Sequence, residues 1–144
     1  MKTGLLVPAI VLLAACQAPQ SVTVDNAWVR LAAVPANPSA AYFTLKVGGK
    51  DETLTGVSST AAMRSEMHEN ITTGGTMSMA PLKIVAVRAG SAVTFAPRGK
   101  HVMLFGLKPD VKAGDTVPLT FTFASGQAVT VTARVVAAGD PAPE

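Results

Sequence analysis

Cysteine, aromatic residues and charge are all scarce in this chain of 144 residues. A single cysteine cannot close a bridge within the chain, so a disulfide-stapled mini-protein is excluded. Charged residues make up 15% and hydrophobic residues 49%, which excludes an intrinsically disordered chain. The net charge of +3 is spread thinly and forms no basic stripe of the kind that nucleic-acid binding needs. We therefore expect one folded domain with no nucleic-acid partner.

The only long apolar run lies at the N-terminus. Residues 4–13 are apolar, but a helix that spans a bilayer needs about 20 such residues. Behind the basic start Met1–Thr3, the run fits the central part of a secretory signal peptide. The segment Leu13–Cys16 then resembles the lipobox of bacterial lipoproteins.

The lipobox resemblance implies that the chain is cleaved before Cys16 and carries a lipid on that thiol. We expect a signal peptide at residues 1–15, a lipidated tether at 16–21 and a periplasmic protein held at the membrane by its lipid anchor. Gln17, where aspartate would favour retention at the inner membrane, favours the outer membrane of a Gram-negative host. The alternative is an ordinary signal peptide with an incidental cysteine. In both cases the folded part has no thiol, which excludes dithiol redox chemistry by this chain alone.

From Val22 onward, short apolar alternations are separated by Gly, Pro, Asn and Asp. This pattern is typical of an all-β sandwich or barrel of Greek-key type. We assign residues 22–136 to one β-domain and 137–144 to a flexible tail. The strands are expected at Val22–Arg30, Ala41–Val47, Thr53–Ser59, Met63–Glu69, Ile84–Arg88, Ala92–Ala96, His101–Leu107, Val117–Phe123 and Ala128–Val136. The aromatic residues expected in the core are Trp28, Tyr42, Phe43, Phe95, Phe105, Phe121 and Phe123.

Histidine and methionine are confined to one part of the chain. Apart from Met1, all of them lie between residues 63 and 103, namely Met63, Met67, His68, Met77, Met79, His101 and Met103. Imidazole and thioether donors without a thiolate suit Cu(I). A lone histidine or methionine is usually structural, so the indication comes from their joint placement.

Strand geometry separates ligand candidates from core candidates. Residues i and i+2 share a face, so His101 and Met103 can reach one ion and would face out. Val102 and Leu104 would then face the core. By the same alternation, His68 is a better ligand candidate than Met67, which we expect in the core. Met77 and Met79 share a face if their segment is extended.

The spacing of four of these residues is specific. Ten residues separate His68 from Met79, twenty-one separate Met79 from His101, and one separates His101 from Met103. This H-x10-M-x21-H-x-M motif, together with Ala27–Arg30, resembles the periplasmic CuA chaperone family, PCu(A)C. The resemblance implies a cupredoxin-like β-fold with His68, Met79, His101 and Met103 as Cu(I) ligands. It also implies delivery of copper for the CuA centre of cytochrome c oxidase, with the CuA subunit or another assembly chaperone as partner.

Several alternatives stay open. Met77 could ligate in place of Met79, and the protein could buffer copper or confer tolerance without a dedicated recipient. A metal-free β-sandwich lipoprotein that binds another molecule is the alternative from a different class. A blue-copper site is excluded because it needs a cysteine thiolate. The sequence has no G-x-S-x-G motif, and both histidines are already candidate metal ligands, so it does not indicate a hydrolase. We expect a binding protein and no enzyme.

Overall fold

Ten β-strands and no helix make up residues 21–144, the part of the chain that the computed structural model describes. The expected all-β, cupredoxin-like fold is confirmed. The strands are β1 (Val22–Arg30), β2 (Ser39–Val47), β3 (Glu52–Ser58), β4 (Arg64–Thr73), β5 (Thr76–Pro81), β6 (Val85–Val87), β7 (Ala92–Phe95), β8 (Lys100–Phe105), β9 (Thr116–Phe123) and β10 (Ala128–Val136). The expected signal peptide and the lipidation site Cys16 lie outside the described residues. Within residues 21–144, no helix has the length and apolar character to cross a membrane.

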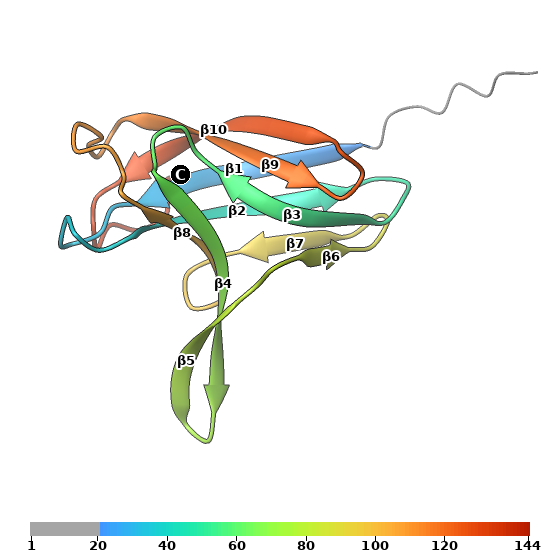
Figure 1. Ribbon diagram of the computed structural model, residues 1–144, viewed down its shortest axis with the longest axis horizontal. Coiled ribbons are helices and arrows are strands. Elements are labelled where there is room, and N and C mark those ends of the chain that lie inside the picture. Colours follow the sequence, from blue (N-terminus) through green and yellow to red (C-terminus); the bar gives the residue numbers. More distant parts are fainter. Residues whose placement is uncertain (1–20) are drawn as a thin grey trace, which may run out of the picture.

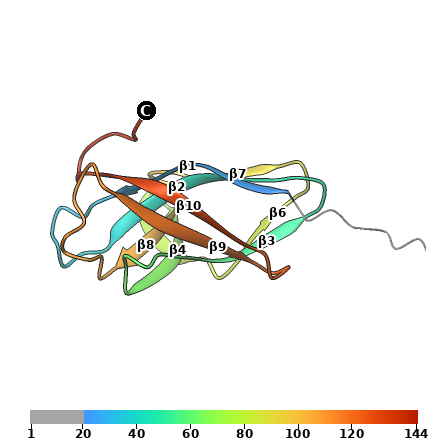
Figure 2. The same cartoon turned by 90° about the horizontal axis from the view of Figure 1, so that it is seen from above.

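The strands form one sheet that curls around the core. Its order is β5-β4-β8-β2-β1-β10-β9-β3-β6, and β7 pairs with β2. Figure 2 shows β1, β2 and β7 along one side of the molecule and β3, β4 and β9 along the other. β3 and β4 meet across an open seam, where the Ser65 hydroxyl donates a hydrogen bond to the Val57 carbonyl. This seam makes the fold a barrel that is closed on all but one side.

Aromatic rings from three strands form the centre of the core. Phe43 on β2 stacks on Phe95 of β7 at 4.3 Å between ring centroids. Phe121 on β9 contacts Phe43 edge-on, with 4.6 Å between ring centroids. One cluster of rings therefore joins β2 and β7 to β9 across the core. β9 alternates buried and exposed residues along its length, which is the period-2 pattern of a half-buried strand.

Phe105 corrects one expectation about the core. It is only partly buried, and the Arg64 guanidinium lies over its ring at 4.0 Å. The reason is strand parity, because Phe105 shares the outer face of β8 with Met103. Trp28 and Tyr42 are buried as expected, but they pair with each other at 4.5 Å outside the main core cluster.

The hairpin formed by β4 and β5 was only partly anticipated. β4 continues to Thr73, where the sequence pattern indicated an end at Glu69, and β5 returns beside it. Gly74 and Gly75 join the strands with φ of 58° and 81°, as a two-residue turn with two positive φ angles requires. The outer part of this hairpin projects from the body as a two-stranded arm (Figure 1).

The last eight residues contain no strand. Two arginines of the body nevertheless contact them, because Arg30 donates to the Asp140 carbonyl at 3.1 Å and Arg134 to the Glu144 carbonyl at 3.3 Å. The division of the chain into signal, tether, domain and tail stays a prediction.

Candidate metal centre

The two histidines of the chain face each other across the pair β4–β8. His68 on β4 lies directly opposite His101 on β8, and their rings stack at 6.1 Å between centroids with 24° between planes. Directly opposite residues in an antiparallel pair project from the same face. Glu66 lies opposite Met103 one step along the ladder, so Met103 shares this outer face. The ladder therefore brings three predicted ligands, His68, His101 and Met103, to one place.

The two faces of β8 have different roles. Val102 and Leu104 are fully buried in the core, as expected. His101 was expected to face out, yet only 7% of it is exposed. The β2–β8 register, continued by one pair beyond Ala41–Val102, sets Tyr42 opposite His101. Tyr42 is itself 8% exposed, so this part of the outer face is largely shielded from water.

The Trp28–Tyr42 pair borders this region. A register shift between Asp25 and Trp28, where Asn26 has φ of 52°, sets Trp28 opposite Tyr42. The Arg30 guanidinium lies 5.0 Å from the Trp28 ring and 5.9 Å from the Tyr42 ring. Burial raises the pKa of the Tyr42 phenol, and the positive charge of Arg30 opposes part of that rise. Tyr42 is therefore a neutral neighbour of the histidine pair at physiological pH.

The remaining predicted ligand lies on the hairpin. Met79 is opposite Asn70, and Met77 is opposite Thr72, so both share the outer face with His68. They are 54% and 59% exposed. Met79 is a diagonal neighbour of His68, about 7–8 Å away between Cα atoms. Strand spacing puts the Cα atom of Met79 roughly 16 Å from the Cα atom of Met103, since the two residues are two strands and four residues apart. The ladder thus places Met79 beside His68 but away from Met103.

Each imidazole has one nitrogen held by an oxygen acceptor. His68 Nε2 lies 3.0 Å from Glu66 Oε2, and His101 Nδ1 lies 3.0 Å from the Gly99 carbonyl oxygen. His68 Nδ1 is buried and has no hydrogen-bond partner among residues 21–144. A buried polar atom without a partner is rare in proteins and is explained when an ion or a water binds there.

Glu66 is itself held by a second partner. Its Oε1 accepts a hydrogen bond from Arg64, the same arginine that covers Phe105. Arg64, Glu66 and His68 are alternate residues of β4, so they share its outer face. The alternation along this strand predicted that His68 faces out, but it did not predict the contacts along that face. The signal that could have found them is the Glu-x-His pattern on a strand.

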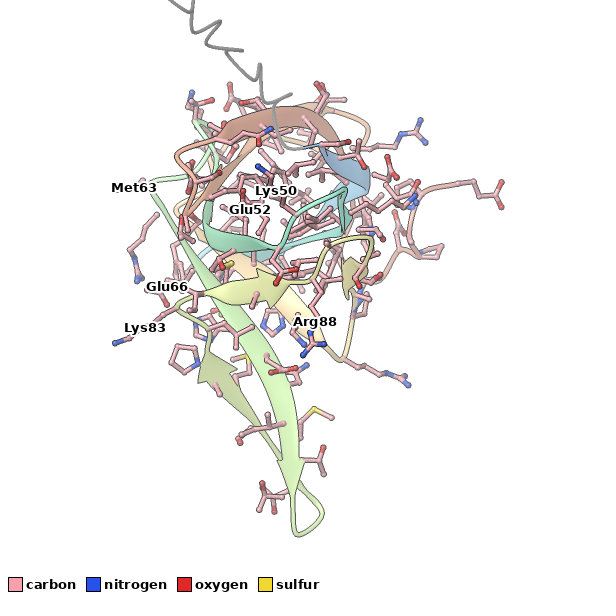
Figure 3. The ribbon with its side chains drawn as sticks, turned by 90° about the vertical axis from the view of Figure 1, so that its right-hand side faces the viewer. Lys50, Glu52, Met63, Glu66, Lys83 and Arg88 are labelled. Carbon is pink, nitrogen blue, oxygen red and sulfur yellow. The ribbon has the colours of Figure 1, made fainter. Side chains whose placement is uncertain are left out.

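The other methionines are separate from this group. Met67 is buried in the core, as expected, while Met63 is 89% exposed and precedes β4 (Figure 3). Residues 21–144 contain no cluster of three or more His, Cys, Asp or Glu side chains that could hold a metal ion. The imidazoles of His68 and His101 and the thioether of Met103 share one face, and such donors suit Cu(I).

A cavity of about 420 Å³ lies at the barrel seam. Glu66, on β4, and Lys83, beyond β5, both line it, and Figure 3 shows them on the same side of the molecule. Its other walls are Thr55, Gly56, Val57, Ser58, Ser65, Met67, Pro81, Leu82 and Thr122. Neither histidine lines this cavity, which adjoins the candidate metal centre through Glu66.

Comparison with curated proteins identifies lipoprotein relatives. The chain is 34% identical over 129 residues to "Putative lipoprotein Lxx21020" of Leifsonia xyli subsp. xyli, covering 85% of this chain and 76% of that protein. It is also 34% identical over 87 residues to "Uncharacterized protein RP573" of Rickettsia prowazekii, covering 59% of this chain and 48% of that protein.

Comparison with solved structures identifies copper-protein domains. The copper-bound PCuAC domain of PmoF2 has a TM-score of 0.66 at 21% identity, covering 81% of this chain and 92% of that domain. Apo-DR1885 of Deinococcus radiodurans has a TM-score of 0.61 at 26% identity, covering 95% of each chain. Its Cu(I) form has a TM-score of 0.55 at 27% identity and covers 86% of this chain and 83% of that one.

The sequence-based family differs in name from the one that the motif resembled. A family model described as "Putative lipoprotein LpqE-like" matches residues 22–135, which include every strand but the last residue of β10. The structural neighbours have a PCuAC fold, and the family name agrees with the lipobox at Cys16. The chain therefore belongs to the LpqE-like lipoprotein family and has the fold of PCuAC domains.

Proposed function

We propose that this protein is a lipid-anchored Cu(I) carrier of the periplasm. Its ligands are His68, His101 and Met103 on the β4–β8 ladder, joined by Met79 when the hairpin bends toward them, since the Cα atoms of Met79 and Met103 lie roughly 16 Å apart along the ladder. The observation that carries the proposal is the convergence of both histidines and Met103 on one outer face, beside a buried imidazole nitrogen without a partner. The PCuAC fold supports it, since Cu(I)-DR1885 and the copper-bound PmoF2 domain have similar structures.

The donor set accounts for the choice of oxidation state. Two neutral imidazoles and two thioethers leave bound Cu(I) with its single positive charge, and no anionic ligand favours Cu(II). Glu66 is the nearest carboxylate on this face, and both of its oxygens are already engaged by Arg64 and His68. Thioethers also form no disulfides, which suits an oxidising compartment, although they can be oxidised to sulfoxides.

The exposure of Met79 suits transfer of the ion. An acceptor can approach from the hairpin side, where Met79 is more than half exposed, while the histidine pair is shielded. We infer that acceptor ligands replace Met79 first and the ladder residues last. The copper acceptor that we propose is the CuA subunit of cytochrome c oxidase or another assembly chaperone.

An anaerobic Cu(I) titration against a competing chelator tests the binding site. The mature chain with Cys16→Ser removes the only thiol that could compete for Cu(I). We expect one tightly bound Cu(I), and we expect the double variant His101→Ala/Met103→Ala to bind at least about 1,000-fold more weakly, or roughly 4 kcal/mol. Met63→Leu is the matched control, because it removes an exposed thioether that is outside the proposed ligand set. Equal binding by the double variant would contradict the proposal.

A transfer experiment tests the recipient. The Cu(I)-loaded protein is mixed with an apo CuA domain, and copper in each protein is measured after separation. Movement of copper to the CuA domain faster than from a Cu(I)–chelator complex supports delivery. Retention of copper by this protein would refute delivery to CuA and leave a buffering role.

A further inference from the structure

We propose that the two histidines bind copper through different ring nitrogens, and that Glu66 is the positioning residue that sets this difference. His68 would ligate through Nδ1 and His101 through Nε2. The inference rests on the Cu(I) site proposed above and specifies which atoms of that site hold the ion.

The tautomer of His68 follows from its partner. The Glu66 carboxylate accepts hydrogen bonds and donates none when ionised, so the proton of the neutral imidazole lies on Nε2. The lone pair is then on Nδ1, the buried atom that has no partner among the described residues. The only nitrogen of His68 that can ligate without breaking the Glu66 contact is therefore Nδ1.

His101 has the opposite arrangement. Its Nδ1 faces the Gly99 carbonyl at 3.0 Å, and a carbonyl oxygen is also an acceptor only. The proton lies on Nδ1, and the lone pair lies on Nε2. This contact comes from the backbone two residues earlier, so it depends on the turn before β8 and on no side chain.

The spacing of the rings permits one ion between them. With a metal–nitrogen bond of about 2 Å and about 1.2 Å from nitrogen to ring centre, two rings on one ion can be up to about 6.4 Å apart. The observed separation of the centroids is 6.1 Å. The centroid separation therefore lies within the reach of one ion. Because each lone pair lies in its ring plane and the rings are stacked, the imidazoles must turn about their side-chain bonds to direct both lone pairs at the same Cu(I).

Arg64 completes the support of His68. It donates to Glu66 Oε1 while Oε2 holds His68, and its guanidinium rests on the Phe105 ring. The carboxylate is thus fixed at both oxygens. Outer contacts of this kind orient a metal-binding imidazole and raise its basicity, and their loss commonly lowers metal affinity by about 10–100-fold.

Histidine ¹⁵N NMR tests the proposal on the mature chain with Cys16→Ser. Two-bond proton–nitrogen correlations, recorded at a pH where both imidazoles are neutral, report the tautomer of each ring. In the metal-free protein we expect Nε2–H at His68 and Nδ1–H at His101. Observation of Nδ1–H at His68 would overturn the inference before any metal is added.

Addition of Cu(I), which is diamagnetic, then identifies the ligating atoms. We expect the ¹⁵N signals of His68 Nδ1 and His101 Nε2 to shift. A shift of His68 Nε2 would overturn the inference while leaving the Cu(I) site intact. Binding of Cu(I) without a shift at either histidine would overturn both the inference and the proposed ligand set.

Variants isolate the role of Glu66. Glu66→Ala should mix the His68 tautomers and lower Cu(I) affinity by about 10–100-fold, with the His101 tautomer unchanged. Glu66→Gln, whose amide oxygen still accepts a hydrogen bond, should restore the Nε2–H tautomer. The matched control is Glu69→Ala, which removes a carboxylate paired with Lys100 on the opposite face of the same strand. An unchanged His68 tautomer in Glu66→Ala would refute the positioning role.

Discussion

The two halves of the candidate metal centre are held in different ways. The ladder half, which consists of His68, His101 and Met103, lies on strands that continue into the body of the sheet. The hairpin half, Met77 and Met79, lies on β5, which pairs only with β4 and ends the sheet. The ladder half is therefore ordered by the core beneath it, whereas the hairpin half depends on one two-stranded arm.

This difference assigns a different role to each half. A site that rests on a packed core keeps its geometry without metal, which reduces the cost of binding. A ligand on a thin arm can leave and return at lower cost, because fewer contacts hold it. Retention and release of copper would then come from different residues of one site.

The largest expected effect comes from removing the support under the ladder half. Leu104 is fully buried beside Met103, and its truncation leaves a cavity in the core. We expect Leu104→Ala to lower the free energy of unfolding by about 2–5 kcal/mol. Denaturant unfolding measures this loss, and Cu(I) affinity of the folded fraction should change much less. If Leu104→Ala lowered Cu(I) affinity as much as His101→Ala/Met103→Ala does, the ladder would not be ordered independently of the metal.

A smaller effect is expected from the hairpin half. Met79→Leu keeps the volume of the side chain and removes its sulfur, so we expect Cu(I) affinity to fall roughly tenfold, or about 1.4 kcal/mol. Thermal unfolding should be unchanged because Met79 is more than half exposed. Met77→Leu is the companion variant. A larger loss of affinity in Met77→Leu would make Met77 the ligand.

The smallest effect is expected in the body, at Glu52 on β3. The Ser125 side chain donates to the Glu52 carboxylate and lowers its pKa, against the opposing effect of burial. Because the pKa of Glu52 is lower in the folded state, the ionised carboxylate stabilises the fold at pH values above the ordinary glutamate pKa. That contribution is lost as the pH falls through the pKa of the folded state. Glu52→Gln should cost about 1 kcal/mol at pH 7, typical of one hydrogen bond.

Thermal unfolding at pH 7 and near pH 3 checks the Glu52 prediction. The difference between Glu52→Gln and the parent should shrink at the lower pH, as protonation of the carboxylate removes its contribution. An equal difference in thermal stability between the variant and the parent at both pH values would mean that the lowered pKa of Glu52 does not contribute to stability. Cu(I) affinity should be unaffected, because Glu52 lies at the start of β3, five residues before Val57, where β3 meets β4.

Alternation along the chain was enough to predict most strands. Ala128–Val136 was predicted with the bounds that the structure has, because its residues alternate between apolar and polar from Val129 to Val135. Val22–Arg30 was also predicted with its bounds, although its alternation breaks after Asp25, where the register shifts. The hairpin arm was harder, since Ile71 and Met77 are exposed and no buried face imposes a period on that segment. Its clearest local signal is the Gly74–Gly75 turn.

The types of donor and their spacing are properties of the sequence alone. Two histidines and clustered methionines, with one cysteine outside the folded part, restrict the chemistry to soft neutral ligands whatever the fold. Strand parity also assigns Met103 and Leu104 to opposite faces without knowledge of any partner strand.

Only the tertiary structure decided which donors meet. The register of β4 against β8 sets His68 opposite His101, and a shift of one residue would turn His68 to the other face. That register arises from packing between residues about thirty positions apart, which no local pattern encodes. The burial of His101 and the Arg64–Glu66–His68 contacts follow from the same long-range pairing. Sequence thus determined the chemistry of the ligands, and packing determined their geometry.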